Sequence, residues 1–144
     1  MDDGRRRFSR MLIDVRGKGQ MMVELFWREA PFHVDALVEL ALSSAYEDVP
    51  VSRADPLLGL DVEPGKAAGS PKAGKRLPPE PHLAPIRRGT LVESPSRPGA
   101  GNFHIAGLPM PELEGKSTVI GRVVLGARLL DSIGRHDRIS IFVD

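Results

Sequence analysis

The sequence predicts a mainly β fold, most simply a barrel whose open ends are covered by two short helices. Segments with alternating or β-branched apolar residues occur in both halves of the chain, and only two segments carry a helical apolar pattern. The 144 residues, 41% of them apolar, are enough for one domain with a hydrophobic core. Closing the sheet leaves no strand edge exposed, which favours a barrel over an open sheet.

The first block of predicted elements begins with a hairpin. Residues 11–16 and 20–27 are rich in apolar residues, and Gly17-Lys18-Gly19 between them predicts a turn, because glycine accepts a positive φ. Pro31 suits a helix N-terminus. A helix is expected after it, because apolar residues recur there every three or four positions: Val34, Leu37, Val38, Ala41 and Leu42. Short apolar pieces follow at 49–51 and 57–60.

Residues 62–100 have a different composition. They hold eight of the thirteen prolines and five of the fifteen glycines, with seven Lys or Arg against three Glu. The prolines at 78, 79, 81 and 85 exclude a helix or a central strand. We expect an extended loop with one short strand near 89–92. So long a loop is either mobile or fixed by a partner; as a basic, proline-rich stretch it is the best candidate for contact with a larger protein complex, and a plain flexible loop is the alternative.

The second block predicts three strands and a second helix. The strands are expected at 102–108, 117–126 and 138–143, with a bend or bulge at Gly121. The helix is expected over 127–133, with its apolar residues on one face and Gly134 at its end. We therefore predict a single domain over 10–144, with a basic N-terminal arm (1–9) and an irregular insertion loop (62–88).

Charge and composition exclude several classes of function. The net charge of +1 gives no reason to expect nucleic acid or a membrane surface as a partner. No apolar run approaches the roughly 20 residues needed to span a bilayer, and the N-terminus lacks the apolar core of a secretory signal. We expect a soluble protein of the cytoplasm or an organelle interior. There is no cysteine, and the four histidines show no ligand spacing, so no metal or other cofactor is expected.

Two segments carry motifs of a known family. GQMMVELFWREAPFHVDALVELA (19–41) has the order G-x-x-x-x-E-L-F, proline, apolar helix; GNFHIAGLPMPELEGKSTVIGRVVLG (101–126) parallels G-S-Q-F-F-I-T, L-D-G-K and V-F-G-x-V-x-x-G. These are motifs of the cyclophilin-type peptidyl-prolyl cis-trans isomerases, which the chain resembles over about 10–60 and 89–144. The resemblance implies a closed eight-stranded barrel capped by two helices.

The resemblance also implies a site, with many substitutions. Arg53, in VSRA, stands where the family has the catalytic arginine of F-H-R-V. In the following F-M-x-Q-G-G, the phenylalanine, methionine and glutamine become Leu58, Gly59 and Asp61. The family's Q-F-F becomes Asn102, Phe103 and His104. The tryptophan before L-D-G-K becomes Glu112, the leucine is Leu113, and the histidine after the lysine becomes Ser117. Arg53 is the candidate catalytic residue, and the others except Gly59 are candidate substrate-binding residues.

Several interpretations stay open at this stage. Arg53 is alternatively a surface arginine, Phe103 is alternatively a core residue, and His104 is alternatively a structural histidine. We also expect Asp61 and Glu112 to lie near enough to Arg53 to form a salt bridge with it. Because the proline pocket loses most of its apolar wall, we expect weak or no isomerase activity and a role in binding protein or proline-containing peptide, as a scaffold subunit of a larger assembly. An active isomerase and a barrel of another function are the alternatives.

Overall fold

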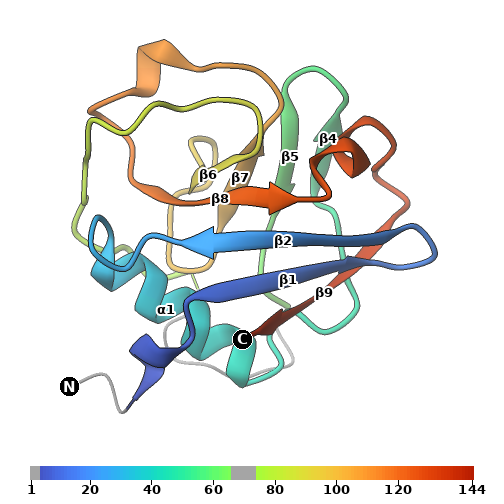
Figure 1. Cartoon of the computed structure of the whole chain (residues 1–144), viewed down its shortest axis with the longest axis horizontal. Helices are drawn as coiled ribbons and strands as arrows, with labels where there is room; N and C mark the ends of the chain where they lie inside the picture. Colours follow the sequence, from blue (N-terminus) through green and yellow to red (C-terminus); the bar gives the residue numbers. More distant parts are fainter. Residues whose placement is uncertain (1–3, 66–73) are drawn as a thin grey trace.

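The computed structural model describes residues 4–65 and 74–144, and Figure 1 shows how they are arranged. The strands within these residues are β1 (Arg10–Val15), β2 (Gly19–Leu25), β3 (Val49–Pro50), β4 (Arg53–Asp55), β5 (Gly59–Val62), β6 (Thr90–Glu93), β7 (Phe103–Ala106), β8 (Val119–Leu125) and β9 (Arg138–Val143). The helical elements are α1 (Pro31–Leu42) and the 3-10 turns η1 (Arg5–Arg7), η3 (Pro111–Leu113) and η4 (Ala127–Asp131). The predicted mainly β fold is confirmed.

The hairpin β1–β2 forms one side of the core. Met11 lies opposite Val23, and Ile13 lies opposite Met21. All four are buried, while the residues that alternate with them are more exposed, as expected for strands with one face on the core. Gly17, in the predicted turn, has a φ of 77°, which glycine adopts at little cost.

The sheet curls so far that one chain segment connects its two ends. The strand order is β3-β9-β1-β2-β8-β6-β7-β5-β4, and the terminal strands β3 and β4 are consecutive pieces of residues 49–55. Val49 pairs with Ile139 of β9, whereas Arg53 pairs with Asp61 of β5. The nine strands described therefore differ from the expected eight chiefly because β3 and β4 divide one extended segment.

Helix α1 packs against the inside of this sheet. Pro31 begins it as predicted, and its buried residues include Val34, Leu37 and Leu40 in the main hydrophobic cluster. The rings of Tyr46 and Phe103 meet in the same cluster with their centroids 6.2 Å apart. The core thus unites α1 with strands from both halves of the sequence.

The second predicted helix is shorter than expected. Residues 127–131 form the 3-10 turn η4, with Gly126 before it at a φ of 84° and Ser132 after it. Five residues between these ends do not complete two α-helical turns. The expected irregularity at Gly121 is present: the register between β6 and β8 shifts beside it, and a Cβ on Gly121 would lie 2.4 Å from the carbonyl oxygen of Glu24.

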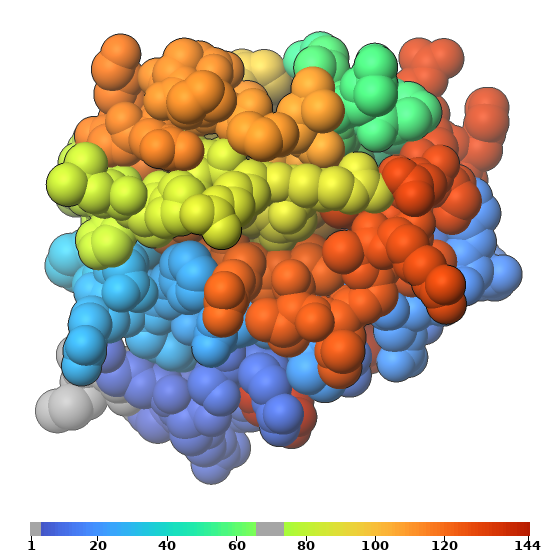
Figure 2. Space-filling model, turned by 45° about the horizontal axis from the view of Figure 1, so that its top comes forward, coloured from blue at the N-terminus to red at the C-terminus, as the bar shows by residue number. Residues whose placement is uncertain are grey.

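Residues 74–88 lie on the barrel itself. Residues 66–73 of the predicted 62–88 loop, and residues 1–3 of the predicted arm, are outside the described part of the chain. Ile86 is fully buried, its N–H donates to the carboxylate of Glu114, and the N–H of Glu80 donates to Thr118 Oγ1. Figure 2 shows the segment as a yellow-green band between the light-blue start of α1 and the orange residues around η3. This part of the loop therefore needs no partner to hold it.

Glu80 anchors the segment to α1 through a buried histidine. Its carboxylate accepts the N–H groups of Phe32 and His33, which are free at a helix N-terminus, and lies 2.5 Å from His33 Nδ1. On the other side of the ring, Nε2 of His33 lies 3.5 Å from Glu93 of β6. The side chain of His33 is only 3% exposed. We name His33, Glu80 and Glu93 the carboxylate clasp.

The carboxylate clasp predicts a pH-dependent stability. Burial alone would lower the pKa of His33, but Glu93 and Glu80 outweigh it and raise this pKa above its ordinary 6.5, while His33 lowers the pKa of Glu93 below its ordinary 4.5. The His33 contribution is complete below about pH 6.5 and is lost as pH rises through the raised pKa; that of Glu93 is complete above about pH 4.5 and is lost as pH falls through the lowered one.

We expect His33→Gln to lower the free energy of unfolding by about 1–3 kcal/mol at pH 6, because two largely buried carboxylates lose their ionic partner. The difference from wild type shrinks between pH 6 and pH 9, because the stabilisation by His33 is lost as pH rises through its raised pKa. Urea unfolding at both pH values measures it, with the exposed His136 as the control in His136→Gln. A difference that is the same at pH 6 and pH 9 contradicts a charged clasp.

Candidate functional site

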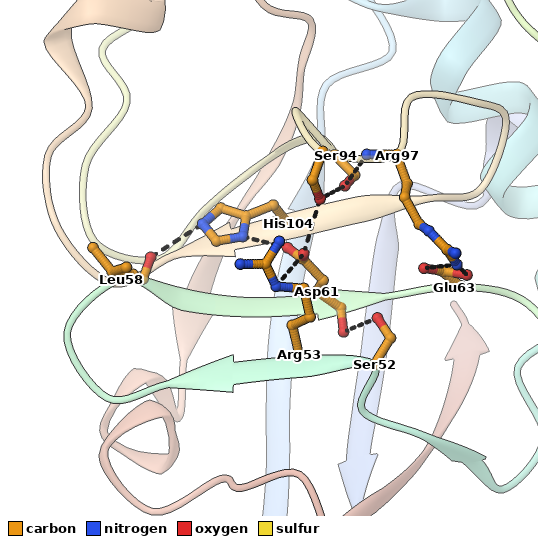
Figure 3. Close-up of polar contacts among 9 residues, drawn as sticks. Ser52, Arg53, Leu58, Asp61, Glu63, Ser94, Arg97 and His104 are labelled. Atoms are coloured by element: carbon orange, nitrogen blue, oxygen red, sulfur yellow. Dashed lines mark hydrogen bonds and ion pairs between the residues drawn. The ribbon is translucent and has the colours of Figure 1, made fainter.

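Three polar side chains stand in line across neighbouring strands on the outer face of the sheet. The antiparallel register places Arg53 of β4 opposite Asp61 of β5, and Asp61 opposite His104 of β7. Residues directly opposite each other point to the same face. Leu60 and Ile105, which alternate with them, are in the core, so this face points outward. We name Arg53, Asp61 and His104 the polar row (Figure 3).

Asp61 and His104 form a close and largely buried pair. His104 Nδ1 lies 2.5 Å from Oδ1 of Asp61, and Nε2 lies 3.1 Å from the carbonyl oxygen of Leu58. The two side chains are 12% (His104) and 10% (Asp61) exposed. Each ring nitrogen of His104 therefore lies within hydrogen-bond distance of an oxygen, one from the Asp61 carboxylate and one from the Leu58 carbonyl. His104 thus combines the two interpretations left open by the sequence: it is held structurally, and it lines the site.

Gly59 lets β5 approach the backbone of β7 closely, beside the His104 ring. A Cβ on Gly59 would lie 2.0 Å from the carbonyl oxygen of Ile105 and 3.0 Å from Nε2 of His104, and the φ of Gly59 is 116°. A side chain here would both clash and strain the backbone. The methionine that the family resemblance implies at this position therefore has no room in this barrel.

Arg53 is the exposed end of the polar row. Its side chain is 71% exposed, and its Nε lies 4.0 Å from Oδ2 of Asp61. The expected pairing with Asp61 is therefore at the outer limit of an ion pair, and an exposed contact of this kind contributes about 0–1 kcal/mol. The guanidinium stays available to a ligand.

A cavity of about 580 Å³ opens beside the polar row, within the size range of ligand sites. Five predicted site residues line it: Arg53, Leu58, Asp61, His104 and Glu112. Leu58 is 59% exposed at the turn between β4 and β5. Asp55 shapes this turn by accepting the N–H groups of Leu58 and Leu57, which lower the pKa of its carboxyl.

The structure separates the other four predicted site residues from the cavity lining. Asn102 donates its side-chain amide to the carbonyl of Arg97, and Phe103 is fully buried in the main core. Leu113 packs on a second, smaller hydrophobic cluster, and the N–H of Ser117 donates to the Leu113 carbonyl. These four residues match positions of the family motifs, but the cavity is lined mainly by β4, β5 and the 107–112 segment.

Several lining residues were missed by sequence reasoning. They are Ser52, Ala54, Asp55, Pro95, Ser96, Leu108, Pro109, Met110 and Arg135, besides Gly59. Ser96 and Leu108 lie in connections between strands, where no periodic pattern assigns a direction to a side chain. That Asp61 and His104 share a face follows from the register between β5 and β7, which the sequence did not predict.

The described residues offer no metal centre and no membrane span. Within 4–65 and 74–144, no three His, Asp or Glu side chains gather in a way that would hold a metal ion. In the same ranges, no helix is long and apolar enough to cross a membrane. The polar row contains two side chains of these types, Asp61 and His104.

Sequence comparison identifies the family. Residues 10–140 match the family described as "Cyclophilin type peptidyl-prolyl cis-trans isomerase/CLD". The chain therefore belongs to the cyclophilin-type family. Among curated proteins, "Peptidyl-prolyl cis-trans isomerase-like 2" of two Cryptococcus neoformans var. neoformans strains (serotype D) is 32% identical over 128 residues. The match covers 81% of this chain but 22% of those proteins, so the chain spans about a fifth of their length.

Solved structures of the family share this fold. A cyclophilin type peptidyl-prolyl cis-trans isomerase from Cryptosporidium parvum superposes with a TM-score of 0.76 at 19% identity, covering 95% of this chain and 98% of that chain. A cyclophilin from Hirschia baltica superposes with a TM-score of 0.75 at 15% identity, covering 94% and 73%. At identities this low, the superpositions establish a shared architecture only. The chemistry has to be argued from the residues of the site.

Proposed function

We propose that this cyclophilin-type domain binds an extended segment of a partner protein at the cavity beside the polar row, with weak or no isomerisation of X-Pro bonds. In this role it acts as a binding or scaffold subunit of a larger assembly. The observation that carries the proposal is the buried Asp61–His104 pair, which places two polar groups in the wall of the pocket.

Isomerisation makes two demands on a site, and the Asp61–His104 pair supports the proposal because it weakens one of them, the apolar surface. The X-Pro bond resists rotation because of amide resonance, with a barrier of about 18–20 kcal/mol. Lowering it requires an apolar surface for the prolyl ring and a charged donor at the amide. Losing one large apolar contact costs about 2–5 kcal/mol in a core. At the lower figure, transition-state binding weakens about thirtyfold.

The alternative function, an active isomerase, has one specific feature in its favour. Arg53 lines the cavity and keeps an exposed guanidinium. If this donor reaches a bound prolyl amide, electrostatic stabilisation of the transition state survives the loss of the apolar wall. The two functions therefore differ in what Arg53 contributes to turnover.

An isomerisation assay on a chromogenic prolyl peptide decides between them. We expect wild-type kcat/KM to be at least about thirtyfold below that of a cyclophilin with an intact apolar wall, and Arg53→Ala to change it little. The matched control is Arg97→Ala, since Arg97 is 70% exposed, lies beside the site in Figure 3 and pairs with Glu63. Strong wild-type turnover that Arg53→Ala abolishes and Arg97→Ala leaves intact contradicts the scaffold proposal.

A further inference from the structure

One oxygen of the buried Asp61 carboxylate, Oδ2, makes only long contacts, and both are with residues that line the cavity. The Asp61 side chain is 10% exposed, and its Oδ1 is taken by His104. Among the described residues, the nearest partners of Oδ2 are Ser96 Oγ at 3.4 Å and Arg53 Nε at 4.0 Å. Charge-assisted hydrogen bonds to a carboxylate are normally about 2.5–2.9 Å long. A ligand that brings a hydrogen-bond donor to Oδ2 therefore satisfies a group that the protein itself leaves poorly paired.

The charges around Oδ2 restrict the ligand. A cationic side chain at Oδ2 would meet the guanidinium of Arg53, which lies 4.0 Å from the same oxygen. An anionic side chain could pair with Arg53 but would face the Asp61 carboxylate. An unmodified prolyl ring supplies no donor and would desolvate both charges without replacing their hydrogen bonds. The side chain that suits both Asp61 and Arg53 is therefore neutral and both donates and accepts a hydrogen bond.

Resting on the proposed peptide-binding function, we infer that the cavity selects a segment with a hydroxyl or carboxamide side chain. Such a group donates to Oδ2 of Asp61 and accepts from Arg53, so serine, threonine, asparagine or glutamine fits where the family resemblance implies proline. Leu58 and Leu108, 59% and 41% exposed, line the same cavity and offer apolar contact to the residues on either side. The predicted ligand is thus a neutral polar residue between apolar ones.

A set of capped pentapeptides, Ala-Leu-X-Leu-Ala, tests this specificity with X as Ser, Asn, Ala, Pro, Lys or Asp. Binding is followed by NMR titration of the backbone amides of Asp61 and His104. We expect the Ser and Asn peptides to bind at least about tenfold more tightly than the Ala and Pro peptides, because the Ala and Pro side chains supply no hydrogen bond to the Asp61 carboxylate. The Lys and Asp peptides gain nothing over Ala.

Variants connect the preference to the polar row. Asp61→Gln/His104→Phe is expected to abolish the preference for Ser over Pro, and Asp61→Asn, which keeps the shape of the side chain, to reduce it below about threefold. Arg97→Ala, outside the cavity lining, is expected to retain it. If the Pro peptide, or a charged peptide, binds wild type as tightly as Ser, the inference is overturned while the peptide-binding function stands. If no peptide shifts the cavity amides, both are overturned.

Discussion

Asp61→Gln/His104→Phe is expected to raise isomerase kcat/KM at least about tenfold, equivalent to about 1.4 kcal/mol of transition-state stabilisation. The change replaces the buried polar pair by the side chains that the family resemblance implies at these positions. It provides an aromatic surface for the prolyl ring and releases Arg53 from its 4.0 Å contact with Asp61. Both effects act on the same bound prolyl bond.

The single variants are informative beside the double one. His104→Phe alone leaves the largely buried Asp61 carboxylate without its 2.5 Å partner, so it should lower stability and gain less activity. Glu63→Gln is the matched carboxylate control, because Glu63 pairs with Arg97 and does not line the cavity. Double-variant activity equal to wild type, in a protein that remains folded, shows that the polar pair is not what limits turnover.

Phe103→Ala is expected to lower the free energy of unfolding by about 3–5 kcal/mol. The Phe103 side chain is fully buried and packs at a tilt on Tyr46, whose hydroxyl donates to the Gly101 carbonyl at 2.6 Å. Urea unfolding with an unchanged m-value measures the loss. Asn102→Ala, one residue away but only partly buried, is the control and should cost far less.

The Phe103→Ala experiment tests whether Phe103 is a core residue, as the structure indicates, or a pocket residue, as the family motif implies. A loss of stability below about 1 kcal/mol, together with weaker peptide binding, would contradict the core position of Phe103. We expect the opposite: a large loss of stability, and peptide affinity unchanged under conditions where the variant remains folded.

Much of the fold was predictable because its signals are local. The glycine turn at 17–19, proline at the start of α1 and alternation in β9 depend on neighbouring residues, and each predicted its element within a few positions. The difference at η4 is also local, since Gly126 and Ser132 leave only five residues between them. Exact strand ends were less predictable, as for the extended segment that divides into β3 and β4.

The fixed position of residues 74–88 was not predictable from composition. Proline excluded regular structure there, correctly, but the partners of Glu80 lie 47 residues away at His33 and 38 residues away at Thr118. A segment without regular secondary structure can still be held in place. Here the Glu80 carboxylate holds it by accepting the N–H groups at the start of α1, which have no partner within the helix. The periodicity of the sequence does not predict such a contact.

The site was predictable in part, for a geometric reason. The substitutions Asp61 and His104 were visible in the motifs, but their direct pairing depends on the register between β5 and β7. Gly59 likewise gains its meaning only from the structure, because a Cβ there would lie 2.0 Å from the Ile105 carbonyl oxygen and 2.8 Å from the Gly107 nitrogen. Neither the strand register nor this close approach of two chain segments can be read from the motifs.

Exchange NMR on a peptide that carries both a serine and an X-Pro bond, mixed with the unmodified domain, tests the central claim most directly, because one sample reports both binding and turnover. We predict shifts of the Asp61 and His104 amides as peptide is added, with cis–trans exchange of the peptide close to its uncatalysed rate. Fast exchange that depends on Arg53 would contradict the account, and so would the absence of any shift at the polar row.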